Sequence, residues 1–186
     1  MSHHREWATA WSVGRLLRQK WPLPSILRQR PDLMAPGIRL HEWSCLHDTG
    51  SLCPEPDTDP EIAGFATGWK RFSYAFSPSW SIREGAFEVL ASDTIPLGFH
   101  GIVDACGSVR GKLTVCDLKT GNPTEAHPIQ LALYTMGLFP KTAHAGTIQR
   151  LNVYVTKDGS FRVVLRDDPR DFILAYDLLR QAKEVG

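Results

Sequence analysis

Two aspartates and a lysine occur on neighbouring predicted strands at a spacing that could support metal chemistry. The strand predicted over 99–106 carries Asp104, and the strand predicted over 113–119 carries Asp117 and Lys119. Side chains two positions apart on a strand point to one face, so Asp117 and Lys119 are expected to lie together. Charged strand ends also form ordinary surface salt bridges, and this pair alone is therefore weak evidence for a site.

The turn between these strands decides whether Asp104 joins the pair. The stretch 107–111, Gly-Ser-Val-Arg-Gly, has the composition of a turn. Directly paired residues of a hairpin share a face. A loop with an even number of residues, such as 108–111, would pair Asp104 with Val115 and place it diagonal to Asp117 on that face. An odd loop without a bulge would separate the two acids.

Two carboxylates brought together in this way indicate a cation between them. Without a cation they repel each other, and the pKa of one is raised. Hard oxygen ligands suit magnesium or manganese. Such an ion can activate water and stabilise charge on a phosphate during an in-line displacement. Lys119 could orient that water or stabilise the developing charge.

Other polar residues could extend this site. Glu88, on a strand predicted over 85–92, offers a third carboxylate, and Glu84 is the competing choice. Gln130 and Tyr134 are four positions apart on a predicted helix and so lie on one side of it. An amide and a phenol there could bind a residue of the metal site or a phosphate. Alternatively, Tyr134 packs its ring and makes a hydrogen bond at the surface.

The order of predicted elements indicates a mixed sheet of about five strands flanked by helices, an α/β (α+β) fold. Helices are predicted over 12–21, from near Gly37 through His41, and over 128–139. A further helix is predicted after Asp59 as N-cap, with Pro60 at its first position. The last helix is predicted after Asp168 as N-cap, with Phe172, Tyr176 and Leu179 as its buried stripe. Strands are predicted over 85–92, 99–106, 113–119, 147–156 and 161–166. The strand–helix–strand unit between 113 and 156 predicts a right-handed parallel crossover, whereas the hairpin before it is antiparallel.

The bulk properties fit an ordinary globular chain. It has 186 residues and a formal net charge of +1, which neither indicates nor excludes nucleic acid. There is no apolar run of the roughly 20 residues that a bilayer requires and no segment like a signal peptide, so we expect a cytoplasmic protein without membrane contact. The four cysteines form no CxxC pair and are expected to be core or boundary residues.

Taken together, these motifs resemble the PD-(D/E)XK nuclease superfamily, above all its RecB-like and phage-type exonucleases. The residues that carry the resemblance are Gly101-Ile-Val-Asp104, Asp117-Leu-Lys119 followed by Thr120-Gly121, Gln130 to Tyr134, Gly37 to His41, and Glu88. The segment that begins Asp59-Pro-Glu-Ile and leads to Trp69 and Phe72 is similar to small phage-type members. The likeness covers about 37–180. We therefore expect residues 1–36 to be a helical or irregular extension and 37–186 to be a single nuclease domain.

The resemblance implies a restriction-endonuclease-like core and metal-dependent hydrolysis of DNA, usually exonucleolytic. It implies one or two Mg²⁺ or Mn²⁺ ions, held by His41, Glu88, Asp104, Asp117 and the backbone carbonyl of Leu118. Lys119 would assist the attacking water, and Gln130 and Tyr134 would support the site and the DNA strand. His47 is the competing choice for His41.

Some RecB-like exonucleases carry an iron–sulfur cluster bound by cysteines after the nuclease motifs. No cysteine follows Cys116, so no cluster is expected. The chain has no helicase motif, so a helicase or recombination partner would be a separate chain. His41-Glu42 begins like a zincin motif, but Cys45 stands where its second histidine would be. The main alternative is a nucleic-acid-binding protein on the same fold that does not cut.

Overall fold

The computed structural model describes residues 11–22, 34–51, 53–55, 59–143 and 146–185. In these residues the chain forms one mixed sheet with the strand order β1-β2-β3-β4-β5. The strands are β1 (Ser79–Val89), β2 (Phe99–Val109), β3 (Lys112–Lys119), β4 (Gln149–Val155) and β5 (Phe161–Leu165). Neighbouring strands are antiparallel except β3 and β4, which are parallel. Helix α5 (Ala126–Leu138) connects that parallel pair, so the predicted mixed sheet of five strands with a crossover is confirmed.

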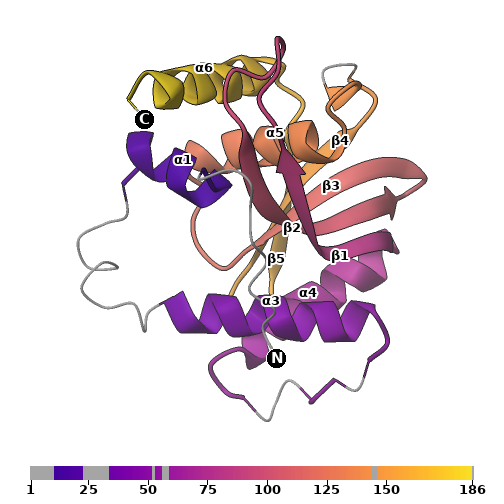
Figure 1. The fold of residues 1–186 in the computed structure, drawn as a ribbon. Coiled ribbons are helices and arrows are strands. Elements are labelled where there is room, and N and C mark those ends of the chain that lie inside the picture. The colour runs from indigo at the N-terminus through magenta and orange to yellow at the C-terminus, as the bar shows by residue number, and fades with distance from the viewer. Residues whose placement is uncertain (1–10, 23–33, 52, 56–58, 144–145, 186) are drawn as a thin grey trace.

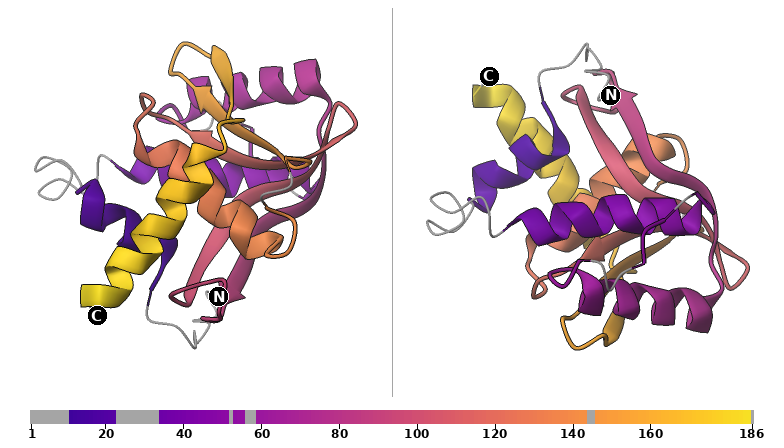
Figure 2. Two further views of the ribbon diagram at one scale, coloured as in Figure 1. Left: turned by 90° about the horizontal axis from the view of Figure 1, so that it is seen from above. Right: turned by 90° about the horizontal axis from the view of Figure 1, so that it is seen from below.

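Helices cover both faces of the sheet (Figure 1). On one face lie α3 (Ala35–Asp48) and α4 (Ala63–Phe76), and on the other lie α1 (Val13–Lys20), α5 and α6 (Arg170–Val185). Figure 2 shows α1 and α6 close together on the α5 side. Each face has its own apolar core: Trp69, Phe72 and Leu118 belong to the α3 side, and Leu16, Leu133 and Leu179 to the α5 side. Strands of a sheet that is buried on both faces are rich in apolar residues.

The first helix is part of this core. The Ser12 side chain accepts a hydrogen bond from the N–H of Arg15, as an N-cap does. Val13, Leu16 and Leu17 are buried on the α5 side. The boundary that the sequence predicts near residue 36 therefore falls between two helices that pack on opposite faces of one sheet. Residues 1–10 and 23–33 of the expected extension lie outside the described residues.

Two helices differ from expectation in detail. α4 begins at Ala63, because Asp59 closes a turn before it: its carbonyl accepts from the N–H of Ala63 at 3.0 Å and its carboxylate from that of Glu61 at 3.1 Å. In α6 the carboxylate of Asp168 accepts from the N–H of Arg170, as predicted for a cap. Tyr176 is 38% exposed, however, and the buried stripe runs instead through Phe172, Ala175, Leu178, Leu179 and Ala182. The two alanines let α6 lie close to its neighbours.

No helix among the described residues is both long and apolar enough to cross a membrane.

Candidate active site

The hairpin between β2 and β3 brings Asp104 beside Asp117. Its loop is Arg110–Gly111, and both residues have positive φ, 50° and 78°, which is typical of a tight type I′ turn. The loop is even, as predicted, but two residues shorter than the predicted 108–111. Paired residues run from Val109↔Lys112 to Ala105↔Cys116. Val115 pairs with Cys106 and not with Asp104, and the pairing ends one residue before the two acids.

Asp117 is fully buried and both of its carboxylate oxygens accept hydrogen bonds. Lys119 Nζ donates to Oδ1 at 2.8 Å, and the Nδ2 of Asn152 on β4 donates to Oδ2 at 2.7 Å. Lys119 Nζ also donates to Gln130 Oε1 at 3.0 Å, and Gln130 Nε2 donates to the hydroxyl of Tyr134 at 2.7 Å. The structure thus joins four of the predicted residues in one hydrogen-bonded chain from β3 to α5.

Asp104 faces the other side of this group. Its Oδ2 accepts from the N–H of Leu118 at 2.8 Å and lies 3.4 Å from Nδ1 of His41 on α3. The backbone group of Leu118 that meets an acid is therefore its N–H, whereas the resemblance implies its carbonyl. His47 lies elsewhere, with Nδ1 2.8 Å from Asp48 Oδ1. Of the two histidines, His41 is the one that the structure brings to the acids.

Glu84, and not Glu88, accompanies Asp104. Arg83 pairs with Ala105 and Gly85 with Val103, so Glu84 stands opposite Asp104, whereas Glu88 pairs with His100 four residues further along β1. Glu84 has a φ of 49°, a left-handed conformation that is costly for a residue with a side chain. The negative charge of Glu84 also raises the pKa of Asp104. Glu88 is thus four residues along β1 from Glu84, about 13 Å in an extended strand, and the pairing does not bring it opposite Asp104 as expected.

Arg83 links α3 to β2, the strand that carries Asp104. Its side chain is 5% exposed; Nη1 donates to the carbonyl of Asp104 at 3.0 Å and Nη2 to Ser44 Oγ at 2.7 Å, while Nε lies 3.3 Å from Asp48 Oδ2. Ser44 and Asp48 are on α3, one and two turns after His41. Arg83 therefore sets the distance between His41 and the acids. The sequence analysis missed this arginine, because its partners become neighbours only in the fold.

Burial dominates the electrostatics of the site. Burial, together with the nearby charge of Asp104, raises the pKa of Asp117 to about 6, against the opposing charge of Lys119. Burial likewise raises the pKa of Asp104. The same desolvation would lower the pKa of Lys119, but Asp117 and Asp104 together raise it. Burial lowers the pKa of His41 and so favours a neutral ring. The acids thus carry a desolvation cost that an added cation would relieve.

Across the residues that the structure describes, no three His, Cys, Asp or Glu side chains come together in a way that could hold a metal ion. Both acids instead accept hydrogen bonds from within the protein: Asp117 from Lys119 and Asn152, and Asp104 from the N–H of Leu118. The chemical types nevertheless fit a divalent ion, because the carboxylates of buried Asp117 and half-buried Asp104 supply hard oxygen ligands.

Four further polar residues extend the site along β4 and β5. Asn152 Oδ1 accepts from Nε of Arg166 at 2.8 Å, and the hydroxyl of Tyr154 accepts from Nη2 of Arg166 at 3.1 Å. Nδ1 of His127 on α5 lies 2.8 Å from the same hydroxyl. None of these residues is singled out by a motif. The one available signal in the sequence is Asn152, an amide between the apolar Leu151 and Val153.

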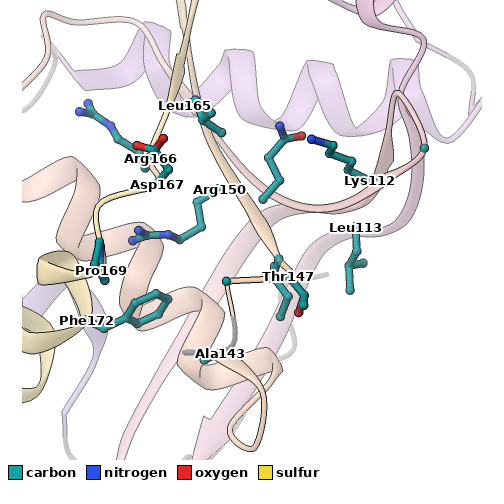
Figure 3. A pocket seen from close by; sticks show the side chains of 14 residues that line it. Lys112, Leu113, Ala143, Thr147, Arg150, Leu165, Arg166, Asp167, Pro169 and Phe172 are labelled. Atoms are coloured by element: carbon teal, nitrogen blue, oxygen red, sulfur yellow. The ribbon is translucent and has the colours of Figure 1, made fainter.

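A separate cavity of about 560 Å³ lies at the other end of β3 and β4, where both strands begin (Figure 3). Lys112, Arg150, Leu165 and Phe172 are among its lining residues, and none of the predicted site residues lines it. Arg150 is paired with Asp171 at 3.0 Å and donates to the carbonyl of Asp168 at 2.9 Å. The charge of Arg150 is therefore paired within the fold.

No protein-family model and no curated protein matches the chain. Among solved structures, 19 chains match. One is the crystal structure of SSO0001, with a TM-score of 0.50 and 18% sequence identity, over 100% of this chain and 80% of that chain. At this level of identity the likeness concerns the fold alone.

Proposed function

We propose that this protein is a metal-dependent nuclease that hydrolyses the phosphodiester bonds of DNA, as an exonuclease. The observation that carries the proposal is the ion pair of buried Asp117 with half-buried Lys119 on β3, with Asp104 on the neighbouring strand. The resemblance of the same residues to PD-(D/E)XK nucleases supports it. A lysine held at 2.8 Å from a fully buried acid, with a second acid on the neighbouring strand, is an unusual arrangement to maintain for stability alone, because burying charges is costly.

Mg²⁺ or Mn²⁺ is the cofactor in this proposal. Asp104 and Asp117 would hold the ion, with His41 and Glu84 beside them. A bound ion of this kind supplies Lewis acidity and lowers the pKa of a bound water, which makes hydroxide accessible near neutral pH. The support lies in the donor set and its burial, since both acids have a raised pKa that a cation would reverse.

Lys119 would direct the attacking water and stabilise negative charge on the phosphate. Its ammonium group is held from two sides, by Asp117 and by Gln130 on α5. Gln130 is itself oriented by the hydroxyl of Tyr134, whose ring is 6% exposed and packs edge-on against Phe87. Donors that are fixed before the reaction stabilise developing charge without a cost of reorganisation.

The proposal includes a reducing cytoplasm as the setting. All four cysteines are free. Any helicase or recombination protein that delivers DNA ends would be a separate chain.

The first experiment is digestion of linear and circular duplex DNA by the purified protein, with Mg²⁺ or Mn²⁺ and with EDTA as the metal-free control. An exonuclease removes the linear DNA and leaves the circles intact. Nicking of circles would make the protein an endonuclease on the same chemistry.

One observation favours a second function, a nucleic-acid-binding protein that does not cut. In the described residues the two acids are engaged by hydrogen bonds and no set of three metal ligands is preformed. Binding of the same DNA without loss of linear or circular forms, with either metal, would support that function and refute the nuclease.

A further inference from the structure

The sheet face that carries Asp117 and Lys119 continues onto the edge strand β5 with Arg162, and directly after that strand with Arg166. Lys119 pairs with Tyr154 on β4, and Tyr154 pairs with Arg162 on β5. Directly paired residues share a face, so these three side chains form one row across the sheet. Arg166 follows Arg162 by four positions, and its N–H donates to the carbonyl of Arg150 at 2.9 Å, which continues the β5 pairing. Arg166 therefore also lies on this face.

Both guanidinium groups are held by Tyr154, whose own side chain is buried. Arg166 donates to its hydroxyl at 3.1 Å, and the guanidinium carbon of Arg162 lies 5.2 Å from the centre of its ring. Asn152 accepts the Nε–H of Arg166 at 2.8 Å. Figure 3 shows the guanidinium of Arg166 directed away from that of Arg150, which points toward Pro169 and Phe172. Arg166 therefore extends toward Tyr154 and Asn152 of the acid site, although it also lines the cavity, whereas Arg162 does not line the cavity.

Charge distinguishes these arginines from others in the chain. Arg39, Arg150 and Arg170 each form an ion pair with an aspartate or glutamate, whereas within the described ranges neither Arg162 nor Arg166 has an acidic partner within 4.0 Å. The pKa of the intervening His127 is lowered to about 4. Burial is the main cause, and the positive charges of Lys119 and Arg166 act in the same direction, as expected for a region of positive potential. Guanidinium groups with donors to spare favour phosphate oxygens.

We propose that Arg162 and Arg166 bind a backbone phosphate of a polynucleotide strand, next to the phosphate that occupies the site at Asp117 and Lys119. The inference rests on the proposed function for the identity of the strand. The backbones at Lys119 and Arg162 are two strand spacings apart, or about 10 Å. Long side chains at that separation can reach neighbouring phosphates of one strand. Asn152 and Tyr154 position the arginines, and Arg162, which is exposed, makes the contact that a substitution can remove most cleanly.

The test is binding of fluorescein-labelled oligothymidylate, measured by fluorescence anisotropy in EDTA so that no cleavage occurs. The parent, Arg162→Gln and Arg110→Gln are titrated between about 0.05 and 0.2 M salt. Arg110 is the matched control, because it lies in the β2–β3 turn at the far end of β3. Loss of one phosphate contact makes the slope of log K against log salt less negative by about 0.7, which corresponds to about fivefold weaker binding at 0.1 M salt.

A reduced slope in Arg162→Gln alone, with partial recovery in Arg162→Lys, supports the subsite. Equal slopes in the parent and Arg162→Gln, an equal loss in Arg110→Gln, or no binding by the parent overturns it. Cleavage is scored separately with Mn²⁺. If the parent binds DNA, Arg162→Gln reduces the salt slope and the parent does not cut, the nuclease proposal is refuted and the phosphate site at Arg162 stands. If the parent cuts DNA but Arg162→Gln leaves the salt slope unchanged, the nuclease proposal stands and the phosphate site is refuted.

Discussion

Replacing Asn152 with leucine should destabilise the protein through the hydrogen bond that it donates to Asp117. Asn152 is fully buried, and leucine has a similar size, so the substitution opens little space. Asp117 Oδ2 loses a 2.7 Å bond and cannot recover it from water, because Asp117 is also fully buried. A lost hydrogen bond to a charged group costs about 1.5–3 kcal/mol. Arg166 loses its 2.8 Å bond to Asn152 as well, but it is only partly buried and can regain a water.

The expected loss is therefore about 3 kcal/mol in the free energy of unfolding, or about 6–12 °C in Tm for a chain of this size. Urea denaturation measures it, with an unchanged m-value as the sign of an unchanged unfolded state. Asn122→Leu is the matched control, since Asn122 is exposed. In an Asp117→Leu background the acceptor is gone, and Asn152→Leu should then cost less than about 1 kcal/mol. An equal cost in both backgrounds, or no cost in the parent, would refute this reasoning.

Three further predictions concern other parts of the fold. Burial, Lys119 and Arg166 lower the folded-state pKa of His127 from 6.5 to about 4, so between these pH values the unfolded chain takes up a proton that the folded chain does not. Stability falls as the pH drops through this window, and urea midpoints at its two ends should differ less in His127→Gln than in the parent. A Cβ at Gly64 would lie 1.8 Å from the carbonyl oxygen of Lys157, so Gly64→Ala should cost about 1–3 kcal/mol in the same assay, whereas Gly121→Ala, with no described atom beyond its neighbours within 4 Å, should cost nothing. In DNA cleavage, Glu84→Gln should lose about tenfold or more and exceed the loss in Glu88→Gln, and the reverse order would return the role to Glu88.

Local patterns predicted the elements and the central residues of the site. The alternation of strand 113–119 places Asp117 and Lys119 together, and the helical spacing of Gln130 and Tyr134 places both in the hydrogen-bonded chain that reaches them. These relations depend only on the period of one strand or one helix, which the sequence contains directly.

Relations between elements were less accessible. The exact loop of the β2–β3 hairpin depends on Arg110, a non-glycine residue, taking a positive φ beside Gly111. The choice between Glu84 and Glu88 depends on the pairing of β1, which begins at Ser79, six residues before the predicted strand. Neither the left-handed conformation of Glu84 nor this register leaves a local signal in the sequence.

The polar network on β4 and β5 was missed for a similar reason. Asn152, Tyr154 and Arg166 acquire their roles from cross-strand neighbours, and each alone is an ordinary residue for a strand or a strand end. A buried amide requires hydrogen-bond partners, and those of Asn152 are Asp117 and Arg166.

The central claim is that the acids and the lysine form a phosphodiester-cleaving centre, and Asp117→Asn tests it most directly. The variant keeps the size of the side chain and removes its charge. With Mn²⁺, the parent should degrade linear DNA and Asp117→Asn should not, while both bind labelled DNA in EDTA and unfold cooperatively. A variant that cuts as fast as the parent, or a folded parent that binds DNA but cuts with neither metal, would contradict the account.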